Sequence, residues 1–168
     1  GGRNMVALDI LIVIAEIAVA LAGFSAVVAN FSDTWTRAKS MLLGNLLAQS
    51  GITLFASLVP LITSQISGGG EEAMRSNWMV SSACYIFFAS LSLIYMVVRQ
   101  RLTHFKSVDI AFCLTFVLAI GAQIYNLYAG AEAWLYLMAL LVNIAYAFIS
   151  FTLLIRPAFT AEVQGDPH

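Results

Sequence analysis

Apolar residues fall into five long runs, separated by short polar segments. The runs cover 6–29, 42–66, 78–98, 108–128 and 133–155. Because about 20 mainly apolar residues suffice for a helix to cross a bilayer, each run is long enough to do so. The last two runs predict a tight helical hairpin at Gly130, since one continuous helix would measure about 70 Å, more than twice the hydrocarbon thickness. The pattern predicts an all-α integral membrane bundle of five transmembrane helices, forming a single domain over 1–168.

The basic residues between the runs predict the orientation of this bundle. With five spans, one side receives Arg37, Lys39, Arg99, Arg101, Lys106 and Arg156, and the other receives Arg3 and Arg75. Cytoplasmic loops carry an excess of Lys and Arg, which places the N-terminus outside and the C-terminus in the cytoplasm. Tryptophans are enriched at membrane surfaces, so we expect Trp78 and Trp134 to be anchors at the outer boundary and Trp35 at the inner one.

The composition fits a membrane protein and narrows the chemistry. The chain of 168 residues is 61% hydrophobic and 10% charged, with a formal net charge of -1. It has no basic run with interleaved aromatic residues, so no nucleic-acid partner is expected. Two cysteines and two histidines supply no metal or haem ligand set, and no nucleophile motif is present. The sequence therefore predicts the lipid bilayer as a partner, no cofactor or metal, and no enzymatic activity.

The first run carries a polar stripe. Four of its residues follow one another at seven-residue intervals: Asp9, Glu16, Gly23 and Asn30. Seven residues are almost two helical turns, so these four share one helix face. Glu16 is close to the midplane, where an ionised carboxylate costs at least about 2.5–3.5 kcal/mol. It therefore needs a protonated state, hydration, a cation or hydrogen bonds, and we expect this helix to be central, packed against its own bundle or against symmetry mates.

A second polar stripe follows the second run, with its members three or four residues apart: Asn45, Gln49, Thr53, Ser57, Pro60 and Ser64. Gln123 and Asn143, in later runs, are at a depth similar to that of Glu16 and Ser57. These groups can form hydrogen bonds between helices or line a permeation path, and the sequence leaves both open. Pro60 frees the carbonyl near Ala56, for which Ser or Thr neighbours are the expected donors.

Residues 15–25 read AEIAVALAGFS, and the span that follows them contains Pro60. This pattern resembles a group of small uncharacterised bacterial membrane proteins that carry an acid-then-Gly-Phe motif in their first helix. The similarity covers the first third of the chain. It implies a location in the bacterial inner (plasma) membrane and transfers no functional residues.

The favoured functional hypothesis is a homo-oligomeric, cation-conducting channel. A ring of first helices would turn the acids into stacked rings. Asp9 would concentrate cations at the outer mouth, and Glu16 would be the selectivity or proton-sensing ring. Gly23 would allow close approach or a bend, and Asn30 would lie at the inner exit.

Two alternatives remain open from the sequence. In the first, the protein is a non-conducting interaction or accessory subunit, and Glu16 is hydrogen-bonded to Asn143 or Gln123 within or between subunits. In the second, it is a small-solute or proton-coupled carrier that uses the polar stripe of the second run as its site.

Overall fold

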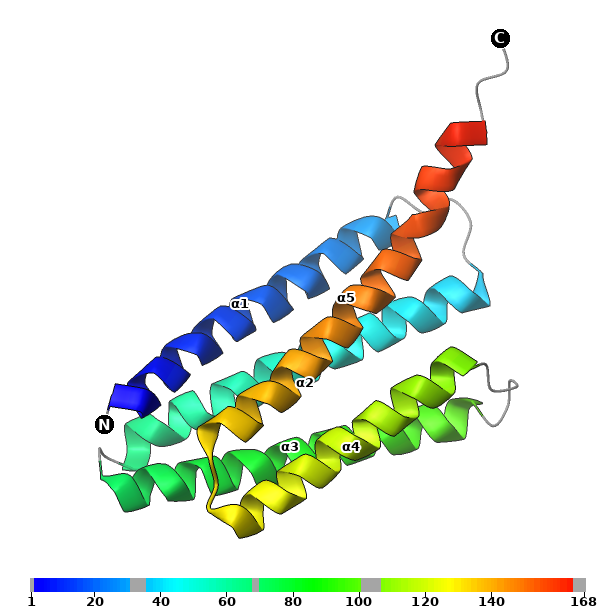
Figure 1. Ribbon diagram of the computed structural model, residues 1–168. Helices are drawn as coiled ribbons and strands as arrows, with labels where there is room; N and C mark the ends of the chain where they lie inside the picture. The colour runs from blue at the N-terminus through cyan, green and yellow to red at the C-terminus, as the bar shows by residue number, and fades with distance from the viewer. Residues whose placement is uncertain (1, 31–35, 68–69, 101–106, 165–168) are drawn as a thin grey trace.

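The computed structural model describes residues 2–30, 36–67, 70–100 and 107–164. These residues form α1 (Gly2–Asn30), α2 (Arg37–Ser67), α3 (Glu71–Gln100), α4 (Ser107–Ala129) and α5 (Ala133–Gln164). Successive helices run in opposite directions, so the start of α1 and the end of α5 lie at opposite ends of the bundle (Figure 1). The structure confirms the all-α prediction.

Four of these helices are long and apolar enough to cross a membrane. The apolar segments are Met5–Val28, Lys39–Ile66, Glu71–Val98 and Ala133–Ile155, and α4 contributes a shorter one, Cys113–Ala129. Large apolar side chains cover much of the outer surface, for example Phe87, Leu118 and Phe148. Water-soluble monomers rarely expose continuous apolar surface, whereas lipid-facing helices do so throughout. Length and surface together indicate a membrane protein.

The helices are not equally central. α2 and α5 pack against each other and each contacts α1, while α3 packs against α2 and α4, and α4 also contacts α5. α1 therefore lies at the edge of its own bundle, on the far side of α2 and α5 from α4 (Figure 1). Any central position of α1 would have to arise between copies of the chain.

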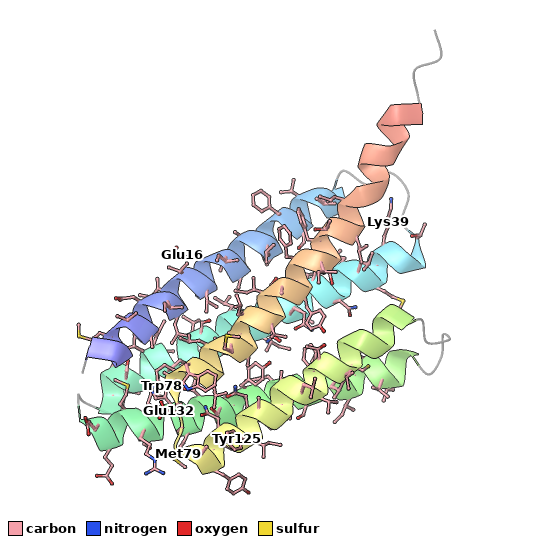
Figure 2. All side chains as sticks on the ribbon, in the orientation of Figure 1. Glu16, Lys39, Trp78, Met79, Tyr125 and Glu132 are labelled. Carbon is pink, nitrogen blue, oxygen red and sulfur yellow. The ribbon has the colours of Figure 1, made fainter. Side chains whose placement is uncertain are left out.

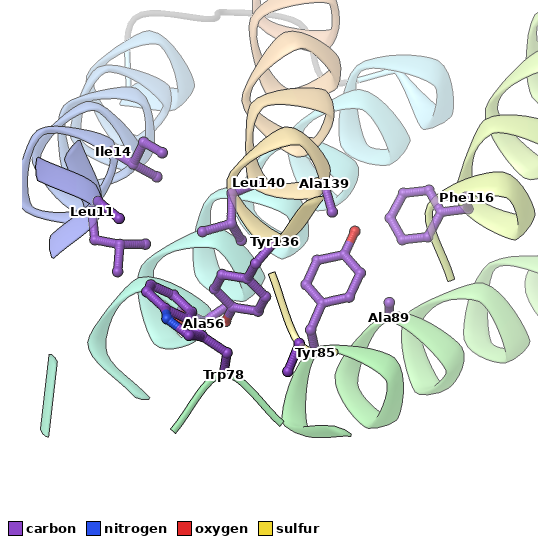
Figure 3. Packing of buried hydrophobic residues seen from close by; sticks show 12 residues of the cluster. Leu11, Ile14, Ala56, Trp78, Tyr85, Ala89, Phe116, Tyr136, Ala139 and Leu140 are labelled. Atoms are coloured by element: carbon purple, nitrogen blue, oxygen red, sulfur yellow. Dashed lines mark hydrogen bonds between the residues drawn. The ribbon is translucent and has the colours of Figure 1, made fainter. Parts of the chain in front are cut away.

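Aromatic side chains form the centre of the main core cluster. Tyr136 of α5 lies between Trp78 and Tyr85 of α3, with ring centroids 5.8 Å and 6.2 Å away (Figure 3). Trp78 is only 2% exposed, so the prediction that it is a surface anchor is wrong. It shares a helix face with Tyr85, seven residues later, and that face packs inward. Trp134 is 60% exposed and keeps a position suited to an anchor, while Trp35 lies outside the described residues.

The connection between α4 and α5 is the predicted hairpin. Gly130 and Ala131 both have positive φ, 123° and 59°, a conformation that favours glycine and reverses the chain after a helix. The Ala131 N–H donates to the backbone oxygen of Asn126 at 2.9 Å. The Glu132 N–H donates to Asn126 Oδ1 at 2.8 Å. The turn is thus fixed by one asparagine of the last turn of α4.

Candidate functional site

The acidic residues of α1 are exposed and lie on the side of the helix opposite its packed face. The packed face of this helix is a continuous seam of buried residues: Ala7, Leu11, Ile14, Ala18, Leu21 and Ser25. Asp9 and Glu16 each follow a seam residue by two positions, which is about 200° around a helix. Both acids and Gly23 are exposed, and Figure 2 shows Glu16 on the side of α1 away from the other helices. Asn30 ends α1, and its side chain lies outside the described residues.

Glu16 has apolar surroundings. It lies in a shallow surface groove between α1 and α2, whose other lining residues are Ile12, Ala15, Val19, Ala20, Leu58 and Leu61. Within the described ranges, Glu16 makes no hydrogen bond or ion pair. A carboxylate on a lipid-accessible face near the middle of a span is costly unless something outside the chain hydrates or pairs with it.

The structure does not bring Glu16 together with the two amides at its depth. Gln123 accepts a hydrogen bond from Ser82 Oγ at 2.9 Å and donates to the backbone oxygen of Leu135 at 2.8 Å. Asn143 Oδ1 accepts from Tyr85 Oη at 3.3 Å. Both amides are buried, and these hydrogen-bond partners lie on α3 and α5. Within one chain, the accessory-subunit arrangement is therefore absent from the described residues.

The polar stripe of α2 faces inward, in contrast to that of α1. Gln49, Thr53, Ser57 and Pro60 are buried, and Asn45 is half-buried. Ser57 Oγ donates to the backbone oxygen of Thr53 at 2.8 Å. The stripe thus brings a line of amide and hydroxyl groups to the interior of the bundle, with half-buried Asn45 at its edge.

The proline in this stripe is stabilised by other helices. Proline lacks the N–H that would bond the carbonyl four residues earlier, and Tyr136 Oη of α5 donates to that Ala56 oxygen at 2.6 Å. Asn77 Nδ2 of α3 donates to the Pro60 oxygen at 2.9 Å, and Asn77 also accepts from Thr63. The prediction that a Ser or Thr neighbour satisfies Ala56 is wrong, because the donor is a tyrosine of another helix.

Replacing Tyr136 tests whether its hydroxyl is the donor to the Ala56 carbonyl. We expect Tyr136→Phe to destabilise the bundle by about 1–3 kcal/mol, because the Ala56 carbonyl loses the hydroxyl donor that replaces the missing N–H of Pro60. In a Pro60→Ala background the cost should be clearly smaller, since the restored backbone N–H at position 60 can bond Ala56. Unfolding titrations of both single variants and the double variant in mixed micelles measure this coupling. Strictly additive losses would contradict it.

Two polar clusters were missed by the sequence reasoning. Asn77 joins α3 to the Pro60 turn, and Ser82 joins α3 to Gln123 and Asn126. The available signal was the helical spacing of Asn77, Ser81 and Tyr85, which places three hydrogen-bonding groups on one face of the third span.

Several buried polar atoms in the core lack a hydrogen-bond partner within the described residues. They are Gln49 Oε1, Ser50 Oγ, Thr53 Oγ1, Trp78 Nε1, Asn143 Nδ2 and Ser150 Oγ. All except the tryptophan belong to α2 or α5, the two helices that pack together at the centre. Buried groups of this kind are usually satisfied by water or a ligand, because each unmade bond costs about 1–3 kcal/mol.

The chain thus has two separate polar surfaces, an outward acidic face on α1 and an inward face on α2 and α5. Within the described ranges, no cluster of His, Cys, Asp and Glu is arranged to hold a metal ion. The chemistry available is hydrogen bonding inside the bundle and negative charge on its outer edge. Comparison of the chain with protein-family models, with curated proteins and with solved structures gives no match.

Proposed function

We propose that this chain is the subunit of a homo-oligomeric, cation-conducting membrane channel in which the outward faces of α1 from several copies enclose the path. The observation that carries the proposal is the position of Asp9 and Glu16 on the face of α1 opposite its packing seam. A charge on that face faces lipid in a single copy, and it becomes tolerable when copies surround it with water.

The residues beside the acids support association through this face. Ala20, Gly23 and Ala26 are exposed, and a Cβ at Gly23 would meet nothing within 4 Å in its own chain. Small residues let helix backbones approach closely, which is the main source of helix association in lipid. Its own chain leaves room for a side chain at Gly23, as at the other described glycines, and the absence of a side chain suits close contact between copies.

The two acids then have different depths in the proposed path. Asp9 forms a ring near the outer mouth and Glu16 a ring about 10 Å deeper, with Asn30 at the inner end. This assignment rests on five spans with the N-terminus outside, as the distribution of Lys and Arg favours. The bacterial inner membrane is the proposed location, on the resemblance of the first helix alone.

Cross-linking tests the proposed assembly. In a background with Cys84 and Cys113 replaced by alanine, Ala20→Cys should form disulfide-linked dimers in membranes under mild oxidation, because α1 faces of neighbouring copies meet. Phe87→Cys, which exposes the thiol on α3, is the matched control and should remain uncross-linked. The mass of the solubilised particle should exceed twice the 18.2 kDa of one chain. A stable monomer, or equal cross-linking at both positions, would overturn the ring.

A second candidate function is a small-solute or proton-coupled carrier. The observation that favours it is the line of unpartnered polar atoms on α2 and α5, which includes Gln49 Oε1, Thr53 Oγ1 and Asn143 Nδ2. A monomeric particle that takes up solute, with uptake sensitive to Thr53→Val and insensitive to Glu16→Gln, would support the carrier. If the protein is instead a non-conducting accessory subunit, we expect no flux and a different protein bound at the α1 face.

A further inference from the structure

A cavity of about 130 Å³ lies between α2, α3 and α4, and no α1 residue lines it. Asn45 and Gln49 of α2 and Ser92 and Tyr95 of α3 supply its polar lining, while Met41, Met96 and Phe116 are among its apolar walls. The two amides are four residues apart on α2 and therefore lie one above the other on the same side of the cavity. The site is independent of the acidic face and of any assembly through it.

Gln49 is the unusual member of this lining. It is only 6% exposed, and its Oε1 atom has no partner among the described residues. Gln123 offers a comparison within the same fold, because that buried amide uses both its oxygen and its nitrogen in hydrogen bonds. The carboxamide of Gln49 can rotate about its last bond, so either its oxygen acceptor or its N–H donors can face a molecule in the cavity.

The rest of the lining restricts the chemistry of an occupant. Among the lining residues none is charged, so an ionic group would enter without a counter-charge. Methionine and phenylalanine provide adaptable and flat apolar walls, which suit a ring-sized apolar body. An apolar cavity of about 150 Å³ is large enough for a benzene-sized molecule, so the volume is of the right order.

We propose that this cavity binds a small uncharged molecule with a hydrogen-bonding group on an apolar, ring-sized body, and that Gln49 recognises its polar group. Water alone is a poorer occupant for most of the space, because a confined water needs two to four polar partners and most of the lining residues are apolar. Gln49 therefore has a use in ligand recognition that the packing of the bundle does not supply.

The test uses 4-fluorophenol as the probe and fluorobenzene as its counterpart without a hydrogen-bonding group. Fluorine NMR of the purified full chain in lipid nanodiscs reports saturable binding against empty nanodiscs. We expect Gln49→Met to weaken 4-fluorophenol binding by about tenfold, because one buried hydrogen bond is lost. Fluorobenzene should bind weakly and equally to both proteins. Both probes also partition into lipid, so the difference in 4-fluorophenol binding between the wild type and Gln49→Met reports binding at the cavity.

Two controls separate recognition from loss of structure. Gln49→Met removes an unpartnered amide and keeps the side-chain length, so its melting temperature should equal or exceed that of the wild type. Ala48→Leu fills the cavity from the same helix and should abolish binding of both probes. Binding of 4-fluorophenol that is unchanged in either variant would overturn the proposal, as would a wild-type signal equal to that of empty nanodiscs.

Discussion

Glu16→Gln should reduce cation flux through the reconstituted protein by about tenfold or more and lower its preference for cations over anions. The substitution keeps the shape of the side chain and removes only its negative charge. Because Glu16 makes no hydrogen bond or ion pair within the described part of its own chain, folding of the subunit should be unaffected. Flux assays in proteoliposomes with a cation-sensitive dye, together with reversal potentials, measure both effects.

The controls for this experiment come from the same chain. Glu72→Gln removes an exposed carboxylate at the start of α3 and should leave flux unchanged. Glu16→Asp keeps the charge at nearly the same position and should retain most of the selectivity. A wild type that conducts nothing above empty vesicles would exclude the channel. Equal selectivity of Glu16→Gln and the wild type would show that Glu16 does not line the cation path. That result would not contradict the proposed assembly of several copies.

Asn126→Leu should produce the largest loss of stability, about 2–4 kcal/mol. Asn126 Nδ2 donates to Ser82 Oγ at 3.3 Å and to the Glu132 oxygen at 3.2 Å, and its Oδ1 accepts from the Glu132 N–H at 2.8 Å. Leucine has a similar volume and leaves the Glu132 backbone groups without this partner at a part-buried turn. Unfolding by denaturing detergent, followed by tryptophan fluorescence, measures the loss.

Asn143→Leu is the matched substitution for this prediction. Asn143 is equally buried, yet its Nδ2 has no partner among the described residues and its Oδ1 has one long hydrogen bond from Tyr85. Its replacement should therefore cost about 1 kcal/mol or less. Similar losses for the two asparagines would show that burial alone, and not the turn, determines the effect.

The elements of this fold could be predicted from the sequence, because a run of apolar residues long enough to span a bilayer is a strong signal. The stripe containing Glu16 could also be predicted, because the seven-residue spacing fixes which residues share a face. The direction of that face could not. In lipid both the packed and the exposed sides of a helix are apolar, so hydropathy does not separate inside from outside. The seam through Leu11 and Ala18 decides the direction, and only the fold reveals it.

The rotation of a helix about its axis, which the sequence does not reveal, also explains the other differences between the sequence predictions and the structure. The sequence predicts Trp78 as an interfacial anchor, but its position on α3 directs it into the core. The sequence also predicts Gln123 and Asn143 at the depth of Glu16, but both amides are buried whereas Glu16 is exposed. The donor to Ala56 is a tyrosine 80 residues further along the chain, a pairing that no local spacing indicates. The sequence predicts how far along a span a residue lies, whereas the rotation of each helix about its own axis is set by its neighbours.

The short connection at 130–132 has a consequence for biosynthesis. A newly made α4 would have Ser82 of α3 as a partner for the carboxamides of Gln123 and Asn126, but it would lack the partners that follow it in the chain. Those partners are the backbone oxygen of Leu135 in α5, 12 residues after Gln123, and the backbone groups of Glu132 in the connection, 6 residues after Asn126. We infer that α4 and α5 enter the bilayer together as a preformed pair. The segment after α4 then supplies hydrogen bonds that the α4 carboxamides need in a hydrocarbon environment.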